Sequence, residues 1–163
     1  MESAIQQSCR DCALRPDRVF CDLPINVLEA FDGVKSTIVC PRSTVLFREG
    51  QPALGVFVLC EGRAKLSVCS ESGKRLTLQV AVPGEVLGLS AALSGGPYEV
   101  TAELLDNARV AMVKRKDLLG FLREHREACL HVVDLLSQDL HIAYERVRSV
   151  GLGRSRRSRA SQA

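Results

Sequence analysis

Between residues 36 and 114 apolar and polar positions alternate with a period of two, which is typical of β-strands with one buried face. Clusters of Pro, Gly and Ser interrupt the alternation about every ten residues and predict the turns between strands. The sequence predicts seven strands: Thr37–Cys40, Thr44–Arg48, Val56–Cys60, Ala64–Cys69, Leu76–Val82, Glu99–Leu105 and Arg109–Lys114. Many short strands at this spacing predict a mainly β sandwich or barrel, and the need to protect sheet edges favours a rolled double sheet, a jelly roll or double-stranded β-helix.

Helical spacing of the apolar residues replaces this alternation on both sides of the strands. It predicts a short helix over residues 23–33, with a proline in its first turn and a glycine at its end. A second short amphipathic helix is predicted over residues 116–125, and a long one over residues 126–150.

The long helix carries one apolar residue at every third or fourth position along a single face. These residues, here called the seam, are Cys129, Val133, Leu136, Leu140, Ala143, Val147 and Val150. Such a spacing over about three heptads is typical of a coiled-coil dimer. The alternative is one wide apolar face packed on the chain's own core. A second apolar stripe on the same helix requires a second partner, which favours the dimer.

The length of 163 residues allows one sizeable core with a helical extension. A hydrophobic content of 46% and a charged content of 25% are typical of a soluble globular protein. No apolar run is long enough to cross a membrane and no secretory segment follows Met1, so we expect a cytoplasmic protein. The expected organisation is a leader (1–22), a β-roll with flanking short helices (23–125), a dimerisation helix (126–150) and a disordered basic tail (151–163).

The net charge of +3 arises from the tail. Four arginines lie in the last ten residues, so the rest of the chain carries 3 − 4 = −1. A nearly neutral body does not favour nucleic-acid binding by the folded part.

Seven cysteines, an odd number without a secretory segment, argue against a disulfide framework. Those in predicted strands, Cys40, Cys60 and Cys69, are expected to be small buried apolar residues. Cys9, Cys12 and Cys21 cluster in the polar leader as C-x2-C-x8-C. Three thiolates at this spacing suit an iron–sulfur cluster or zinc, either of which needs a fourth ligand. Free or redox-active thiols are the alternative.

The segment Gly84–Glu103 has the highest density of glycine in the predicted β region. Gly84 and Gly88 frame its start, and Gly95-Gly96-Pro97 follows. Glycines permit a positive φ and a close approach of the backbone, so we expect a tight loop around a ligand or against another chain.

The order of these elements, with four motifs, resembles the sensor half of the Crp–Fnr family of bacterial transcription regulators. The motifs are Leu46–Gly50 (LFREG), Gly55–Leu59 (GVFVL) followed by Glu61-Gly62, Gly73–Arg75 (GKR) and Gly84–Gly88 (GEVLG). The resemblance extends from about Cys9 to Leu152. It implies a β-roll followed by a long helix that pairs across a twofold axis.

In family members that bind cyclic AMP, the segment that matches Gly84–Glu103 is the phosphate-binding cassette, and Gly84, Glu85 and Gly88 match its first residues. The glutamate that binds the ribose falls on Leu89, and the Arg-Ser pair that holds the phosphate falls on Glu99 and Val100. A carboxylate at that place repels a phosphate. We therefore expect no cyclic AMP binding, while Thr101 and the backbone amides of residues 94–96 remain available to another ligand.

The leader makes the chain more similar to the Fnr branch, in which clustered cysteines hold an iron–sulfur cluster. The family's fourth cysteine falls on Ala111 or a close neighbour, so the ligand set is incomplete here. Cys40 or Cys129 is the alternative fourth ligand.

The resemblance implies the sensor domain of a transcription regulator that acts as a dimer and responds to a signal. The family's helix-turn-helix domain follows the long helix, but no apolar helical pattern follows Leu152, so we expect no sequence-specific DNA binding by this chain alone. The expected partner is a second copy of the chain. The alternative is a ligand-free adaptor, or an inhibitory dimerisation partner of a full-length regulator. All three histidines, His125, His131 and His141, lie in predicted helices rather than on strands, which argues against a jelly-roll metalloenzyme, and no enzyme activity is expected.

Overall fold

The computed structural model describes residues 23–160, with side chains up to Gly151. The chain divides into two compact units within its last helix, one ending at Cys129 and the other beginning at Leu130. Among residues 23–160, the first unit holds all the strands and the shorter helices. No helix among the described residues is long and apolar enough to cross a membrane.

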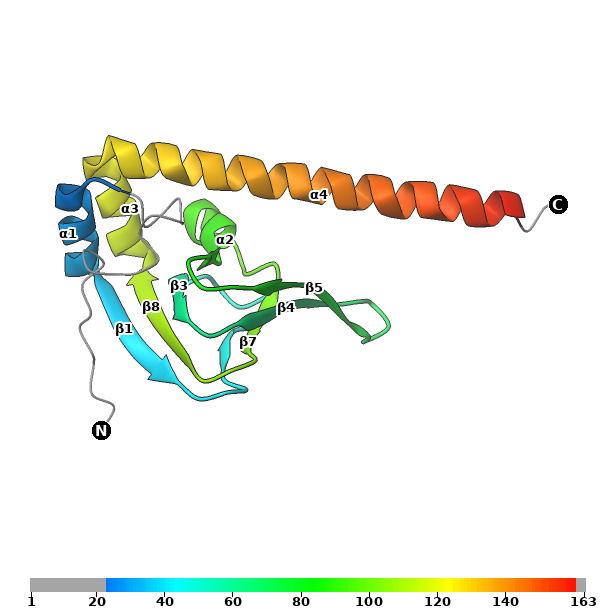
Figure 1. Ribbon diagram of the computed structural model, residues 1–163, viewed down its shortest axis with the longest axis horizontal. Helices are drawn as coiled ribbons and strands as arrows, with labels where there is room; N and C mark the ends of the chain where they lie inside the picture. Colours follow the sequence, from blue (N-terminus) through cyan, green and yellow to red (C-terminus); the bar gives the residue numbers. More distant parts are fainter. Residues whose placement is uncertain (1–22, 161–163) are drawn as a thin grey trace. The chain divides into compact units, whose positions relative to one another are not determined.

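Eight strands form two antiparallel sheets that curl around a common interior (Figure 1). The strands are β1 (Lys35–Cys40), β2 (Val45–Phe47), β3 (Gly55–Glu61), β4 (Ala64–Cys69), β5 (Arg75–Ala81), β6 (Val86–Leu87), β7 (Thr101–Leu104) and β8 (Ala108–Lys114). One sheet has the order β1-β8-β3-β6 and the other the order β2-β7-β4-β5. Consecutive strands β4 and β5 form a hairpin, whereas most other pairs join strands that are distant in sequence.

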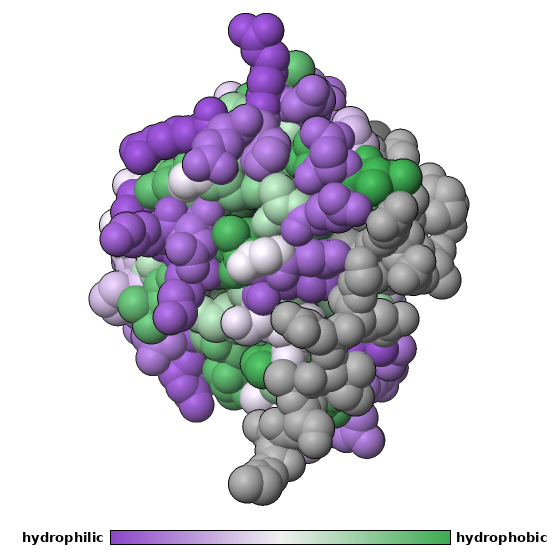
Figure 2. All heavy atoms as spheres, turned by 90° about the vertical axis from the view of Figure 1, so that its left-hand side faces the viewer, coloured by the Kyte–Doolittle hydropathy of each residue, from purple (hydrophilic) through white to green (hydrophobic). Residues whose placement is uncertain are grey.

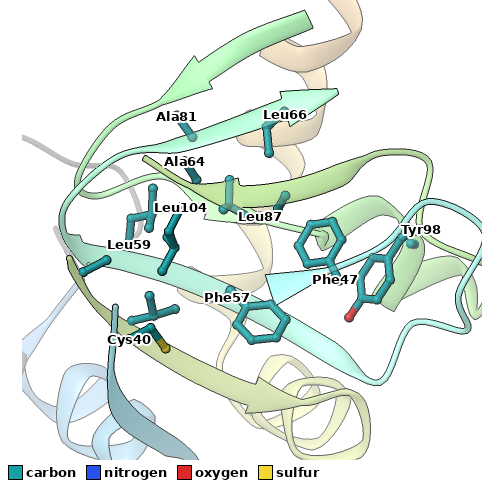
Figure 3. Packing of buried hydrophobic residues seen from close by; sticks show 14 residues of the cluster. Cys40, Phe47, Phe57, Leu59, Ala64, Leu66, Ala81, Leu87, Tyr98 and Leu104 are labelled. Carbon is teal, nitrogen blue, oxygen red and sulfur yellow. The ribbon is translucent and has the colours of Figure 1, made fainter. Parts of the chain in front are cut away.

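The core of the roll consists of side chains from alternate positions along the strands, which point inward. Both sheets contribute to it, including Phe57 and Leu59 from β3, Leu66 from β4 and Leu104 from β7. Figure 3 shows that the aromatic side chains gather at one end of this cluster and the aliphatic ones at the other. The core is therefore filled by large apolar residues at the end where the glycine-rich segment enters it.

Two short helices, α1 (Ile25–Val34) and α3 (Arg115–Glu124), pack against each other beside the roll. Pro24 precedes the first turn of α1, where its missing N–H costs no hydrogen bond. Phe31 of α1 and Phe121 of α3 are buried with ring centroids 5.7 Å apart.

Hydrophilic side chains separate small hydrophobic areas on the face of the molecule in Figure 2.

The predicted rolled double sheet is confirmed, and the seven predicted strands are present within one or two residues of their predicted bounds. The structure adds β6 and a six-residue helix, α2 (Leu89–Ser94), inside the segment that we expected to be a loop. A two-residue strand is too short to give a period, and the surrounding glycines conceal so short a helix.

The last helix, α4, spans Arg126–Ala160 and so extends ten residues beyond its predicted end at Val150. The expectation of a tail without regular structure from Gly151 is wrong for residues 151–160. Glycine costs about 1 kcal/mol in a helix but does not end one by itself, and arginine and alanine are good helix formers. Residues 161–163 lie outside the described part of the chain.

The cysteines of the strands differ from one another. Cys40 is buried in the core, as expected, but Cys60 is half-buried and Cys69 is exposed. Cys69 is the last residue of β4, where the hairpin leaves the body of the roll, so the expectation of a buried side chain is wrong there.

Candidate functional site

The glycine loop, residues Gly84–Glu103, starts as a continuation of the roll. The N–H of Gly84 donates to the carbonyl of Leu59 at 2.7 Å, and the N–H of Leu59 donates to the carbonyl of Glu85 at 3.0 Å. Gly84, Gly88 and Gly95 adopt φ values of 94°, 80° and 76°, which favour glycine. Helix α2 lies between the last two, so the glycines mark the turns into and out of a short helix.

Tyr98 is the side chain by which this loop enters the core. Its ring stacks on Phe47 of β2, with centroids 4.1 Å apart and planes 20° apart. Its hydroxyl donates to the carbonyl of Gly55 at 2.6 Å and accepts the N–H of Gly55 at 3.3 Å. Figure 3 shows Tyr98 beside Phe47 at the aromatic end of the core. Only 4% of the residue is exposed, so the ring is packed inside the roll and the hydroxyl has its hydrogen-bond partners there.

The main chain of the loop is bound to the connection between β2 and β3. The N–H of Tyr98 donates to the carbonyl of Gln51 at 2.9 Å, and its carbonyl accepts the N–H of Gly50 at 2.8 Å. Next to them, Pro52 and Pro97 form an isolated bridge. The motif at residues 46–50 and the glycine loop, which are far apart in sequence, are therefore neighbours in space.

Arg115 closes the other side of α2. Its Nε donates to the carbonyl of Ala92 at 2.7 Å, which satisfies one of the free carbonyls at the end of that helix. A Cβ on Gly95 would lie 3.0 Å from Nη2 of Arg115, so the glycine leaves room for the guanidinium. Arg115 thus has a structural role at the end of the loop.

The residues at the expected nucleotide-binding positions do not form a charged site. Leu89, in the first turn of α2, is buried, and Glu99 is exposed in the bend before β7. Val100 is half-buried and packs against the core cluster. The structure therefore places an apolar side chain, an exposed carboxylate and a second apolar side chain at the positions that would hold a ribose and a phosphate.

Thr101 is already engaged within the chain. Its Oγ1 accepts the N–H of Glu49 at 3.0 Å, and the Glu49 carboxylate accepts the N–H of Cys69 at 2.9 Å. Both contacts join the β2–β3 connection to the end of a strand, β7 for Thr101 and β4 for Cys69. Thr101 is 7% exposed and fixes the start of β7 to the β2–β3 connection.

The clearest electrostatic effect in the roll lies in two surface connections. Arg63, between β3 and β4, donates from Nε and Nη2 to the two carboxylate oxygens of Asp106, between β7 and β8, at 2.9 Å and 3.1 Å. This pairing lowers the pKa of the Asp106 carboxyl and raises the pKa of the Arg63 guanidinium, chiefly through the side-chain hydrogen bonds.

The predicted metal ligands Cys9, Cys12 and Cys21 lie outside the described residues. Ala111, the position of the family's fourth cysteine, is buried in β8 between Thr37 of β1 and Val58 of β3, and its methyl group cannot bind a metal. In the described part of the chain, no group of three or more His, Cys, Asp or Glu side chains is placed to hold a metal ion. The fourth ligand of the predicted site therefore does not come from Ala111.

The seam of α4 is open to solvent. Cys129 and Ala143 are exposed, and Val133, Leu140, Val147 and Val150 are each more than half exposed; Leu136 is half-buried. These side chains keep the spacing that the sequence predicts along a continuous helix. An apolar row of this kind is a candidate surface for a second helix.

Sequence reasoning missed Tyr98 and Arg115. Tyr98 is one of only two tyrosines in the chain and follows Gly95-Gly96-Pro97, which could have singled it out. Its partners Phe47 and Gly55 lie more than forty residues away in the sequence, so no local pattern points to them.

Comparison with known proteins places these features in a family. Residues 37–125 match the sequence profile described as "Cyclic nucleotide-binding domain". The transcriptional activatory protein AadR of Rhodopseudomonas palustris is 25% identical over 140 residues, which cover 86% of this chain and 57% of AadR. The transcriptional activator protein Anr of Pseudomonas aeruginosa is 28% identical over 109 residues, covering 66% of this chain and 44% of Anr. The chain thus spans about half the length of the curated relatives it matches.

Among solved structures, the catabolite activator protein of Thermus thermophilus is similar with a TM-score of 0.75 and 19% identity. The match covers 82% of this chain and 62% of that protein. At this identity the likeness shows a shared fold.

Proposed function

Because this chain belongs to the cyclic nucleotide-binding domain family and is homologous to Crp–Fnr regulators, we propose that it is the sensory module of a transcription regulator. AadR and Anr are named as activators of transcription. A cytoplasmic location, the absence of catalysis and the absence of sequence-specific DNA binding by this chain alone are parts of the same proposal. The signal-receiving part in this proposal is the roll with its leader, and the output passes through α4.

The solvent-exposed apolar residues of the seam on α4 are the main support for this function. Exposed apolar residues at a and d spacing are stabilised when a second helix covers them. A symmetric dimer covers the seams of both copies at once. A signal received by the roll or by the leader would then act by changing how strongly the two helices pair.

The degenerate cassette supports a signal other than a cyclic nucleotide. Leu89 offers no acceptor to a ribose hydroxyl, and Glu99 offers no cation to a phosphate. Thr101, which could bind a different ligand, already accepts a hydrogen bond from Glu49.

The oligomeric state tests the proposal. Sedimentation velocity at micromolar concentration should give a dimer for the native chain and a monomer for Leu140→Glu, because a carboxylate in the seam is costly to bury. Gln138→Glu, two residues away and outside the seam, is the matched control and should remain a dimer. A monomeric native chain, or a dimeric Leu140→Glu variant, would contradict the proposal.

A ligand-free adaptor or an inhibitory partner of a full-length regulator is the second candidate, which the same exposed seam favours. Thermal shift against a panel of nucleotides and metabolites separates the two, since a sensor is stabilised by its ligand. Mixing the chain with a full-length relative and measuring native masses detects the mixed dimer. A ligand-induced shift supports the sensor, whereas mixed dimers without any such shift support the partner.

The leader thiols provide a further proposal about the signal. The C-x2-C-x8-C spacing of Cys9, Cys12 and Cys21 suits a soft metal, although Ala111 supplies no fourth ligand. Anaerobic purification followed by iron, sulfide and zinc analysis tests it, with Cys9→Ser as the variant and Cys69→Ser as the control. Stoichiometric metal that is lost only in Cys9→Ser supports a metal site. Metal-free native protein contradicts the proposed site.

A further inference from the structure

Tyr98 differs from the other members of the core cluster because it alone carries a hydroxyl group. Both hydrogen-bonding functions of that hydroxyl are directed at one residue, Gly55, whose carbonyl accepts and whose N–H donates. A buried hydroxyl without partners is costly, so this double contact holds the ring at one place and in one orientation.

The main chain of Tyr98 adds two more hydrogen bonds to the same region. Its N–H donates to Gln51 and its carbonyl accepts from Gly50. One residue thus makes four hydrogen bonds to the segment 50–55, while the ring stacks on Phe47 just before it. No other residue of the glycine loop has so many contacts with this segment among the described hydrogen bonds.

The walls around the ring are formed by backbone as well as side chains. A Cβ on Gly88 would lie 2.7 Å from Cε1 and 3.3 Å from Cδ1 of Tyr98. Gly55 has no room for a side chain either, since its Cβ would lie 2.2 Å from the carbonyl oxygen of Val113. The ring of Tyr98 therefore stacks on Phe47 and lies against Gly88, while its hydroxyl is held by the backbone of Gly55.

We propose that Tyr98 is an internal latch: its side chain occupies a phenol-shaped site in the roll and thereby keeps the glycine loop closed on the β2–β3 connection. The closed loop is then a property of the chain and needs no small molecule. When the ring is removed, the loop opens and the vacated site accepts a phenol from solution. This inference rests on contacts within the roll and is independent of the proposed regulatory function.

Amide exchange followed by NMR tests the latch. In Tyr98→Ala, the amides of Gly50, Gly55 and residue 98 should exchange at least about tenfold faster than in the native chain, because local opening becomes easier. In Tyr98→Phe the ring remains, so only the Gly55 amide, which loses its acceptor, should become faster. Leu104→Ala, at the aliphatic end of the same core, is the control for general destabilisation and should affect these three amides no more than other core amides.

Chemical complementation tests the shape of the site. Millimolar p-cresol, which is the side chain of tyrosine, should raise the melting temperature of Tyr98→Ala and slow the three amides again. Toluene, which lacks the hydroxyl, should do so less, and neither should act on the native chain. Unchanged exchange in Tyr98→Ala, or a folded Tyr98→Ala that does not respond to p-cresol, overturns the latch. If Tyr98→Ala does not fold, the Gly55 amide in Tyr98→Phe decides, and native-like exchange there overturns the latch.

Discussion

A Cβ atom on Gly88 would lie 2.7 Å from Cε1 of Tyr98, closer than side chains approach one another. Gly88 also has a φ of 80°. The second glycine of the GEVLG motif is therefore required for two reasons. It adopts a positive φ, and it leaves room for the ring of Tyr98 that lies against it. This contact links the most recognisable motif of the sequence to the residue that closes the loop.

Gly88→Ala should accordingly destabilise the roll. A left-handed conformation costs a non-glycine residue roughly 1–2 kcal/mol, and overpacking adds about 1–3 kcal/mol. We expect a loss of about 2–5 kcal/mol in the free energy of unfolding by urea. Gly120→Ala in α3 is the matched control, because a Cβ there meets no atom within 4 Å, and it should stabilise by about 0.5–1 kcal/mol. Equal effects of the two substitutions would contradict the role of Gly88.

Thr101→Val should weaken the attachment of the β2–β3 connection. Valine keeps the shape but leaves the Glu49 N–H without its acceptor, which costs about 1–2 kcal/mol. The Glu49 amide should exchange faster in Thr101→Val and remain protected in Thr101→Ser, which keeps the hydroxyl. If the Glu49 amide is as protected in both variants as in the native chain, the hydrogen bond to Thr101 does not hold the β2–β3 connection in place.

Asp106→Asn should reveal a pH-dependent contribution to stability. Arg63 lowers the pKa of Asp106 in the folded chain, so its stabilising effect is present above the carboxyl's unfolded pKa of about 3.9 and is lost as the pH falls through the lower folded value. Native chain and variant should therefore differ in urea unfolding at pH 7 and converge only when the pH falls below the lowered pKa of Asp106 in the folded chain. Glu71→Gln in the exposed β4–β5 hairpin is the control. A difference that persists at low pH would exclude this ion pair as its source.

Local patterns predicted much of the roll. Ala64–Cys69 matches β4 at both ends because its alternation is regular and its turns contain glycine and serine. The pattern failed where structure depends on distant contacts. Helix α2 is six residues long and is stabilised by the cap from Arg115, which lies 23 residues away from Ala92. The end of α4 was missed because glycine lowers helix propensity without preventing a helix.

The candidate site shows the same limit. Counting from Gly84 predicted that Leu89 stands where the family has its ribose-binding glutamate, and the structure adds that its side chain is buried. The count could not show that Tyr98 fills the core, because its partners Phe47 and Gly55 lie on other strands. Sequence thus indicated which ligand groups are missing, and only the fold shows what takes their place.

In this cyclic nucleotide-binding fold the glycine loop is closed by the chain's own side chains, and Leu89, Glu99 and Val100 occupy the positions at which the family's cyclic-nucleotide-binding groups are expected. Isothermal titration calorimetry of the native chain with cyclic AMP and with cyclic GMP tests it most directly. We predict no saturable heat with either nucleotide at micromolar protein and up to millimolar ligand. Saturable binding with a micromolar Kd for either nucleotide would contradict the account.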